Sequence, residues 1–162
     1  MYVKKLSDIT DDMQIICTEY TFTESFENFK FSDNVHTLKL SYYNRSLNDI
    51  NYPKNLKYLQ IHCGLINQNI QMMKISSQCT KLEKLILDHC IIDNLVVPEN
   101  LKTLVLYSSM FKNYDNFPHE LFIISSYCID DPKFEFVKQD DDKFHYIYLK
   151  CPRDHFIKAA NN

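Results

Sequence analysis

One hydrophobic pattern recurs along most of the chain. In each copy an apolar residue is followed by a second one three positions later and by a third two positions after that. The clear copies are Val35-x-x-Leu38-x-Leu40, Leu56-x-x-Leu59-x-Ile61, Leu82-x-x-Leu85-x-Leu87, Leu101-x-x-Leu104-x-Leu106 and Phe144-x-x-Ile147-x-Leu149, with a damaged copy at Leu121-x-x-Ile124. Successive copies start 19 to 26 residues apart. Because self-similarity at such a period is typical of stacked structural units, the pattern predicts an α/β solenoid.

Each copy is expected to supply one short strand to a parallel β-sheet on the concave side of the solenoid. Positions 1, 4 and 6 would point behind the sheet, where neighbouring units bury one another's side chains. Position 9 of the Leu82 unit is Cys90, which we expect to turn inward, with Ile92 apolar again at position 11. In the Val35 unit position 11 is Arg45, so Leu47 is expected to take the inward place.

A second repeat lies directly before the strands. It comprises Phe31-Ser-Asp-Asn34, Tyr52-Pro-Lys-Asn55, Val97-Pro-Glu-Asn100 and Phe117-Pro-His-Glu120. Proline fixes its own φ and pushes the preceding residue toward an extended conformation, so these segments predict turns that lead back into the sheet. The remaining convex segments are short and predict turns, 3-10 segments or extended runs. The exception is residues 69–78, which predict one short helix.

The two ends are less regular. Residues 13–22 are predicted to form the first strand, with either Met13 and Ile16 or Ile15, Cys17 and Phe22 facing inward. Near the other end, 144–149 could form a hairpin with 133–137 or add a last solenoid strand. The preserved spacing favours the solenoid strand.

Length and composition fit a single domain over residues 1–162, with 45% apolar residues available for a core. We predict a cap and first strand in 1–34, core repeats in 35–128, and an irregular last repeat with a C-terminal cap in 129–162. The net charge of -3 and the scattered lysines disfavour nucleic-acid binding. No signal peptide or membrane span is apparent, and the six cysteines lack a C-x-x-C pair. A monomeric protein of the cytoplasm, or of a host cytoplasm, with reduced thiols is expected.

The segment from Cys79 to Cys90 resembles the cysteine-containing leucine-rich repeats of F-box substrate adaptors. The Pro-x-x-Leu-x-x-Leu units look like the short repeats of social-amoeba and giant-virus proteins, including FNIP repeats. The resemblance covers roughly residues 13 to 149 and implies protein–protein interaction, in some members within ubiquitin ligation. Residues 1–12 are too few for an F-box, so we do not expect one in front of the repeats. Abundant Asn, Ile, Lys and Tyr suggest an AT-rich genome of viral or amoebal type.

The pairs His62-Cys63 and His89-Cys90 raise the question of a thiol nucleophile or a zinc site. Stacking of position 7 would bring His62, Asp88 and Tyr107 side by side, about 4.8 Å apart. No oxyanion-binding loop or second ligand pair is apparent, and a single glycine disfavours a phosphate-binding loop. We therefore interpret these residues as core thiols and surface imidazoles, and expect no enzymatic activity, metal or cofactor.

The outward positions of the strands form the candidate partner-binding site. They include Lys39, Tyr42, Tyr58, Gln60, His62, Lys84, Ile86, Asp88, Val105 and Tyr107. Tyrosine is a favoured anchor in interfaces, and Ile86 with Val105 would form an apolar centre ringed by polar groups. The sequence thus favours a non-catalytic module that binds another protein. The alternatives are a substrate-recognition component or competitor in ubiquitin ligation and, less favoured, a cysteine-dependent hydrolase or zinc protein.

Overall fold

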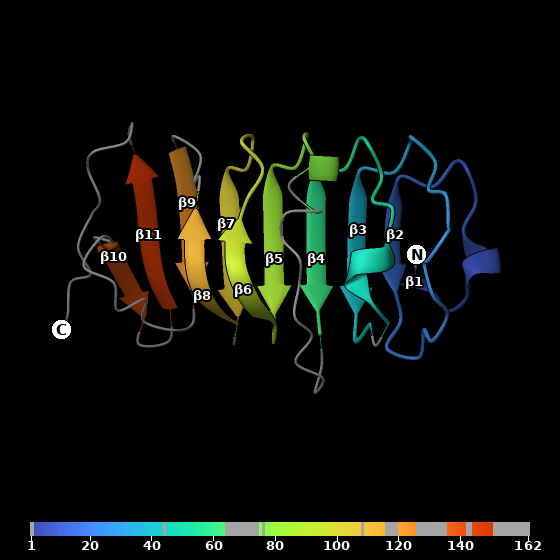
Figure 1. The fold of residues 1–162 in the computed structure, drawn as a ribbon, viewed down its shortest axis with the longest axis horizontal. Coiled ribbons are helices and arrows are strands. Elements are labelled where there is room, and N and C mark those ends of the chain that lie inside the picture. Colours follow the sequence, from blue (N-terminus) through green and yellow to red (C-terminus); the bar gives the residue numbers. More distant parts are fainter. Residues whose placement is uncertain are drawn as a thin grey trace.

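The computed structural model describes residues 2–43, 45–63, 75, 77–107, 109–115, 120–125, 136–141 and 144–150. A nine-stranded sheet has the order β1-β2-β3-β4-β5-β7-β9-β11-β10, and a second sheet pairs β6 with β8 (Figure 1). The strands are β1 (Tyr2–Val3), β2 (Ile15–Thr18), β3 (Thr37–Ser41), β4 (Tyr58–His62), β5 (Lys84–Asp88), β6 (Ile91–Val96), β7 (Thr103–Tyr107), β8 (Met110–Asp115), β9 (Glu120–Ser125), β10 (Phe136–Asp141) and β11 (Phe144–Lys150). In the large sheet, β1 through β9 pair in parallel.

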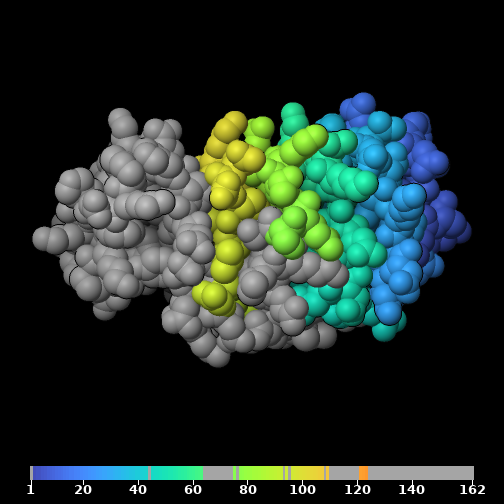
Figure 2. Space-filling view, turned by 45° about the horizontal axis from the view of Figure 1, so that its top comes forward, coloured from blue at the N-terminus to red at the C-terminus, as the bar shows by residue number. Residues whose placement is uncertain are grey.

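The hydrophobic pattern is aligned from strand to strand across β3, β4, β5 and β7. Position 4 forms the row Leu38, Leu59, Leu85, Leu104, and position 6 forms the row Leu40, Ile61, Leu87, Leu106. All eight side chains are fully buried. The predicted parallel strands with inward positions 4 and 6 are therefore confirmed for these four copies. Figure 2 shows the successive copies side by side along the long axis, in chain order.

The segments before β3, β4 and β7 form the predicted turns, and residues 117–119 of the fourth segment lie outside the described part of the chain. The Leu56 N–H donates to the Pro53 carbonyl at 3.2 Å, and the Leu101 N–H donates to the Pro98 carbonyl at 3.0 Å. Three of the segments end in asparagine, and each of these asparagines makes a second contact with the turn of the copy before it. These contacts are Asn34 Nδ2 to the Asp11 carbonyl at 3.0 Å, Asn55 Nδ2 to Asp33 at 2.8 Å and Asn100 Nδ2 to Thr80 at 2.7 Å.

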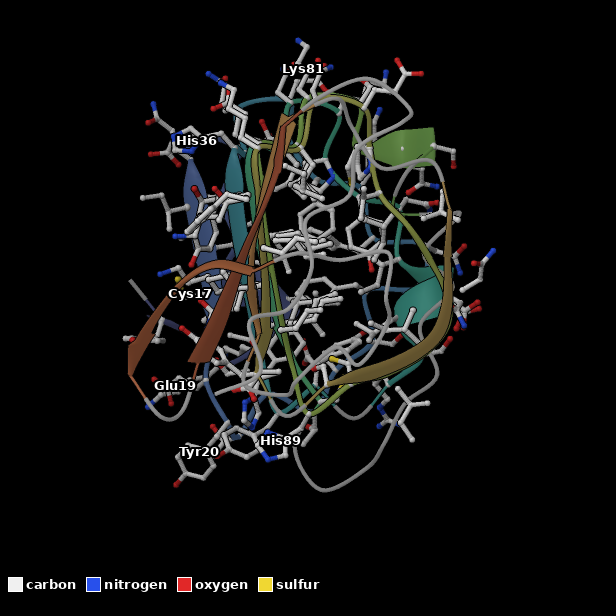
Figure 3. All side chains as sticks on the ribbon, turned by 90° about the vertical axis from the view of Figure 1, so that its left-hand side faces the viewer. Cys17, Glu19, Tyr20, His36, Lys81 and His89 are labelled. Carbon is white, nitrogen blue, oxygen red and sulfur yellow. The ribbon has the colours of Figure 1, made fainter. Side chains whose placement is uncertain are left out.

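Opposite the large sheet lie the returning segments. Figure 3 looks along the row of strands, with that sheet on one side, the second sheet and the 3-10 helix η2 (Leu47–Asp49) on the other, and side chains between them. Leu47 is buried, as predicted. Because β6 pairs with β8, these two return segments are extended runs rather than turns or 3-10 segments. Of the predicted helix, Ile75, Ser77 and Gln78 are helical, and the rest lies outside the described residues.

The first copies enclose an aromatic core. Ile16 in β2 is buried whereas Ile15 is 48% exposed, so the strand has the register with Met13 and Ile16 inward. Phe22, which belonged to the other alternative, is also buried, beyond the end of β2. The cluster consists of Phe22, Phe26, Phe29, Phe31 and Tyr43. Tyr43 also accepts the Phe26 N–H through its hydroxyl at 2.9 Å. Before β2 in the sequence, the chain forms β1 and the 3-10 helix η1 (Leu6–Asp8).

The expectation of a last parallel strand at 144–149 is wrong. Strand β11 runs antiparallel to β9, and β10 pairs antiparallel with β11. Only two residues separate β10 from β11, and a connection this short can join antiparallel strands but not parallel ones. The hairpin alternative is therefore correct, although its first strand is β10, at 136–141.

The copy proposed at Leu121-x-x-Ile124 is also out of register. Leu104 pairs with Ile123, so Ile123 takes position 4 and Ile124 pairs with the outward Val105. Because side chains alternate between the faces of a strand, a shift of one residue exchanges inward and outward positions. The predicted domain boundaries at residues 34 and 128 stay predictions, and residue 128 lies outside the described part of the chain.

Candidate functional site

The side chains that point away from the core along β3, β4, β5 and β7 form three rows. They are Thr37, Tyr58, Lys84 and Thr103 in the first row, Lys39, Gln60, Ile86 and Val105 in the second, and Ser41, His62, Asp88 and Tyr107 in the third. We call these twelve residues the outer face. It contains nine of the ten residues predicted to bind a partner. The tenth, Tyr42, directly follows Ser41 and is 52% exposed.

Tyr58 lies between two lysine side chains of the outer face. Lys39 Nζ lies 5.2 Å from the centroid of its ring, and Lys84 Nζ lies 5.8 Å from it. The Tyr58 hydroxyl donates to Gln60 Oε1 at 3.1 Å. Burial raises the pKa of the Tyr58 phenol, which favours the neutral form that donates this bond. The two ammonium groups make this part of the face electropositive, with an aromatic ring between them.

Ile86 and Val105 do not form the exposed apolar centre that the sequence suggested. They occupy the outer face, but Ile86 is only 9% exposed and Val105 only 2%. In the interior of a sheet each residue has neighbours on adjacent strands about 4.8 Å away, which cover a compact aliphatic side chain. That part of the prediction is wrong. The accessible parts of the face are its longer polar and aromatic side chains.

A second feature lies where β4 and β5 end. His62 and Asp88 are paired in register, and His62 Nδ1 lies 2.5 Å from Asp88 Oδ2. His89 Nδ1 approaches the other oxygen, Oδ1, at 2.7 Å. Since a carboxylate only accepts hydrogen bonds, each imidazole donates from Nδ1. The predicted neighbourhood of His62, Asp88 and Tyr107 is confirmed, and His89 joins it. We call His62, Asp88 and His89 the histidine cluster.

The backbone at His89 brings this cluster together. His89 has a φ of 55°, in the left-handed region that few residues other than glycine adopt and that histidine tolerates better than most. This bend places Cys90 in the core while the His89 imidazole stays beside Asp88. Tyr42 is position 8 of the Val35 unit, as His89 is of the Leu82 unit, and it has a φ of 53°. Its ring centroid lies 4.2 Å from that of His62.

Two thiols lie in the core near the histidine cluster. Cys63 and Cys90 are buried, with 3.0 Å between their sulfur atoms. The hydrogen bond with Cys63, together with burial, raises the pKa of the Cys90 thiol above its ordinary range. Burial raises the pKa of Cys79 to about 12. The predicted core location of these thiols and surface location of the imidazoles are thus confirmed. The described cysteines, Cys17, Cys63, Cys79 and Cys90, are free.

Comparison with known proteins gives no relative: no family model, curated protein or solved structure matches the chain. Within the described residues, no helix has both the length and the apolar character needed to cross a membrane. The geometry of the outer face and of the histidine cluster is therefore what bears on function.

Proposed function

We propose that the protein is a non-catalytic interaction module, a leucine-rich repeat solenoid that binds a segment of another protein through the outer face. The observation that carries this proposal is the register of β3, β4, β5 and β7. It sets long polar and aromatic side chains in rows on a rigid parallel sheet, with a continuous buried core behind them. Such a preorganised surface lowers the entropic cost of binding.

The partner segment is expected to be acidic with an aromatic or aliphatic side chain beside its carboxylate. Lys39 and Lys84 flank Tyr58, so a carboxylate near this ring would meet two cations. An apolar group next to that carboxylate could then pack on the Tyr58 ring, since tyrosine and long cationic side chains are effective interface anchors. Electrostatic complementarity of this kind would also favour the correct partner over competing ones.

A cysteine-dependent hydrolase is less well supported. Thiolate is the reactive form of cysteine, and the raised pKa values of Cys79 and Cys90 keep these thiols protonated near neutral pH. A role in ubiquitin ligation rests on the repeat resemblance alone. Recovery of a Skp1-like or cullin component as a specific partner would support that role.

The proposal is tested by affinity capture from lysate with a matched pair of variants. The face variant carries Tyr58→Ala and Lys84→Glu. The control carries Tyr20→Ala and Lys54→Glu, which make the same chemical changes at exposed positions outside the outer face. We expect mass spectrometry to find a protein retained by the wild type and the control and lost by the face variant. An identical set of captured proteins for all three, with circular dichroism unchanged, would contradict the proposal.

A further inference from the structure

The histidine cluster offers three potential metal ligands. One ligand atom from each of His62, Asp88 and His89 can be chosen so that all lie within 4.8 Å of one another. His62 and Asp88 are the last residues of adjacent parallel strands, and His89 directly follows Asp88. We propose that these three side chains bind a divalent transition-metal ion of the Zn²⁺ type. This inference does not depend on the proposed function of the outer face.

The chemistry of the donor set selects the class of ion. Two imidazole nitrogens with one carboxylate oxygen are common ligands of Zn²⁺ and its transition-metal neighbours, whereas Ca²⁺ and Mg²⁺ prefer sets made of oxygens. Three protein ligands leave a fourth position for water or another donor, as in zinc sites that remain open.

The three ligand atoms must shift before they can share one ion. In a tetrahedral site with bonds of about 2.1 Å, ligand atoms lie about 3.4 Å apart. The Nδ1-to-carboxylate distances of 2.5 and 2.7 Å at His62 and His89 are shorter because a proton is shared across each contact. On binding the ion through Nδ1, each imidazole releases its Nδ1 proton to solvent and carries a proton at Nε2. Each of these two contacts would then lengthen by less than about 1 Å. Ligand atoms that now lie up to 4.8 Å apart would close to about 3.4 Å.

The surroundings hold the ligands in place and leave a path for the ion. The His62 side chain is 19% exposed and that of Asp88 is 22% exposed, whereas that of His89 is 50% exposed. Solvent therefore reaches the cluster from the His89 side. The Tyr42 ring lies against His62 and limits its movement. The Cys90 thiol faces the core, within 3.3 Å of the Asp88 carbonyl, so we assign it no bond to the metal.

The test is titration of the 162-residue protein with Co²⁺ and Zn²⁺, using calorimetry and visible absorption. The wild type is expected to bind one ion per chain at this site, with cobalt d–d bands and no thiolate charge-transfer band. The ligand variant carries His62→Gln and His89→Asn, because asparagine tolerates the left-handed backbone at position 89. It should bind about ten-fold more weakly or worse.

The control variant is His36→Gln. Its imidazole contacts the side chains of Thr37 and Gln14, outside the histidine cluster. It should bind metal as the wild type does. Equal affinity of the wild type and the ligand variant would overturn the proposal. A thiolate charge-transfer band that disappears in a Cys63→Ser, Cys90→Ser variant would also overturn it, since the thiols would then be the ligands. Circular dichroism of each variant separates loss of ligands from loss of fold.

Discussion

At the scale of single residues, the buried hydroxyl of Ser109 holds the backbone where the chain leaves strands β5 and β7. Ser109 is nearly fully buried, and its hydroxyl accepts the Cys90 N–H at 3.0 Å. The same hydroxyl donates to the Tyr107 carbonyl at 2.9 Å. The Ser109 side chain thus satisfies the Cys90 N–H of the preceding copy and the Tyr107 carbonyl of its own copy, at the point where strand pairing has ended.

Replacing Ser109 with Ala should lower the free energy of unfolding by about 1 to 3 kcal/mol, because the buried Cys90 N–H loses its partner. Urea denaturation followed by circular dichroism measures the loss. The control is Ser46→Ala, at an exposed serine whose side chain makes no capping bond to η2. A Ser109 variant as stable as the Ser46 variant would show that this hydroxyl is not needed.

The thiols provide a second prediction at this scale. With a pKa of about 12, Cys79 is thiolate in only about one molecule in ten thousand at pH 8, and the raised pKa of Cys90 has the same effect. Iodoacetamide should therefore modify the partly exposed Cys17 well before either of them in the folded protein. Labelling of Cys79 should accelerate as the pH rises toward 12. Peptide mapping by mass spectrometry follows each site, and Cys90 reacting as fast as Cys17 would refute the buried arrangement.

At the scale of the elements, the spacing of the leucines was sufficient to predict β3, β4, β5 and β7. Inward positions are set by the alternation of a strand, and this alternation is visible directly in the sequence. The same property explains the errors near the C-terminus. In β11, Ile147 and Leu149 alternate as they would in a strand of either direction, so the pattern could not distinguish parallel from antiparallel pairing. In β9, the adjacent pair Ile123 and Ile124 left the register ambiguous.

The asparagine contacts between copies are an element-scale feature that the sequence only hinted at. The Asn55 amide donates to the Asp33 carbonyl and accepts a bond from Lys81 Nζ at 2.6 Å. Replacing Asn55 with Ala should cost about 0.5 to 1.5 kcal/mol of unfolding free energy, since the contact links two copies of the repeat. The control is Asn51→Ala, at an exposed residue outside the strands. Equal midpoints of urea denaturation for the two variants would contradict a stabilising role.

At the scale of the whole molecule, the sequence located the outer face but not its detailed surface. Alternation places Tyr58 and Lys84 outward, as predicted. The burial of Ile86 and Val105 depends on neighbouring side chains, which the spacing does not reveal. Likewise, the meeting of His62 and His89 at Asp88 depends on the left-handed backbone at His89. A pattern of inward leucines carries no information about that bend, so the sequence predicted His62 beside Asp88 but not the approach of His89.

The central claim is that a protein partner binds the outer face, and the affinity of a captured partner for purified protein tests it most directly. Binding to the wild type, the Tyr58→Ala, Lys84→Glu variant and the Tyr20→Ala, Lys54→Glu control is compared by calorimetry. Loss of interface anchors worth about 2 kcal/mol predicts binding about 30-fold weaker for the face variant, with the control unchanged. Equal affinity for all three proteins would contradict the account.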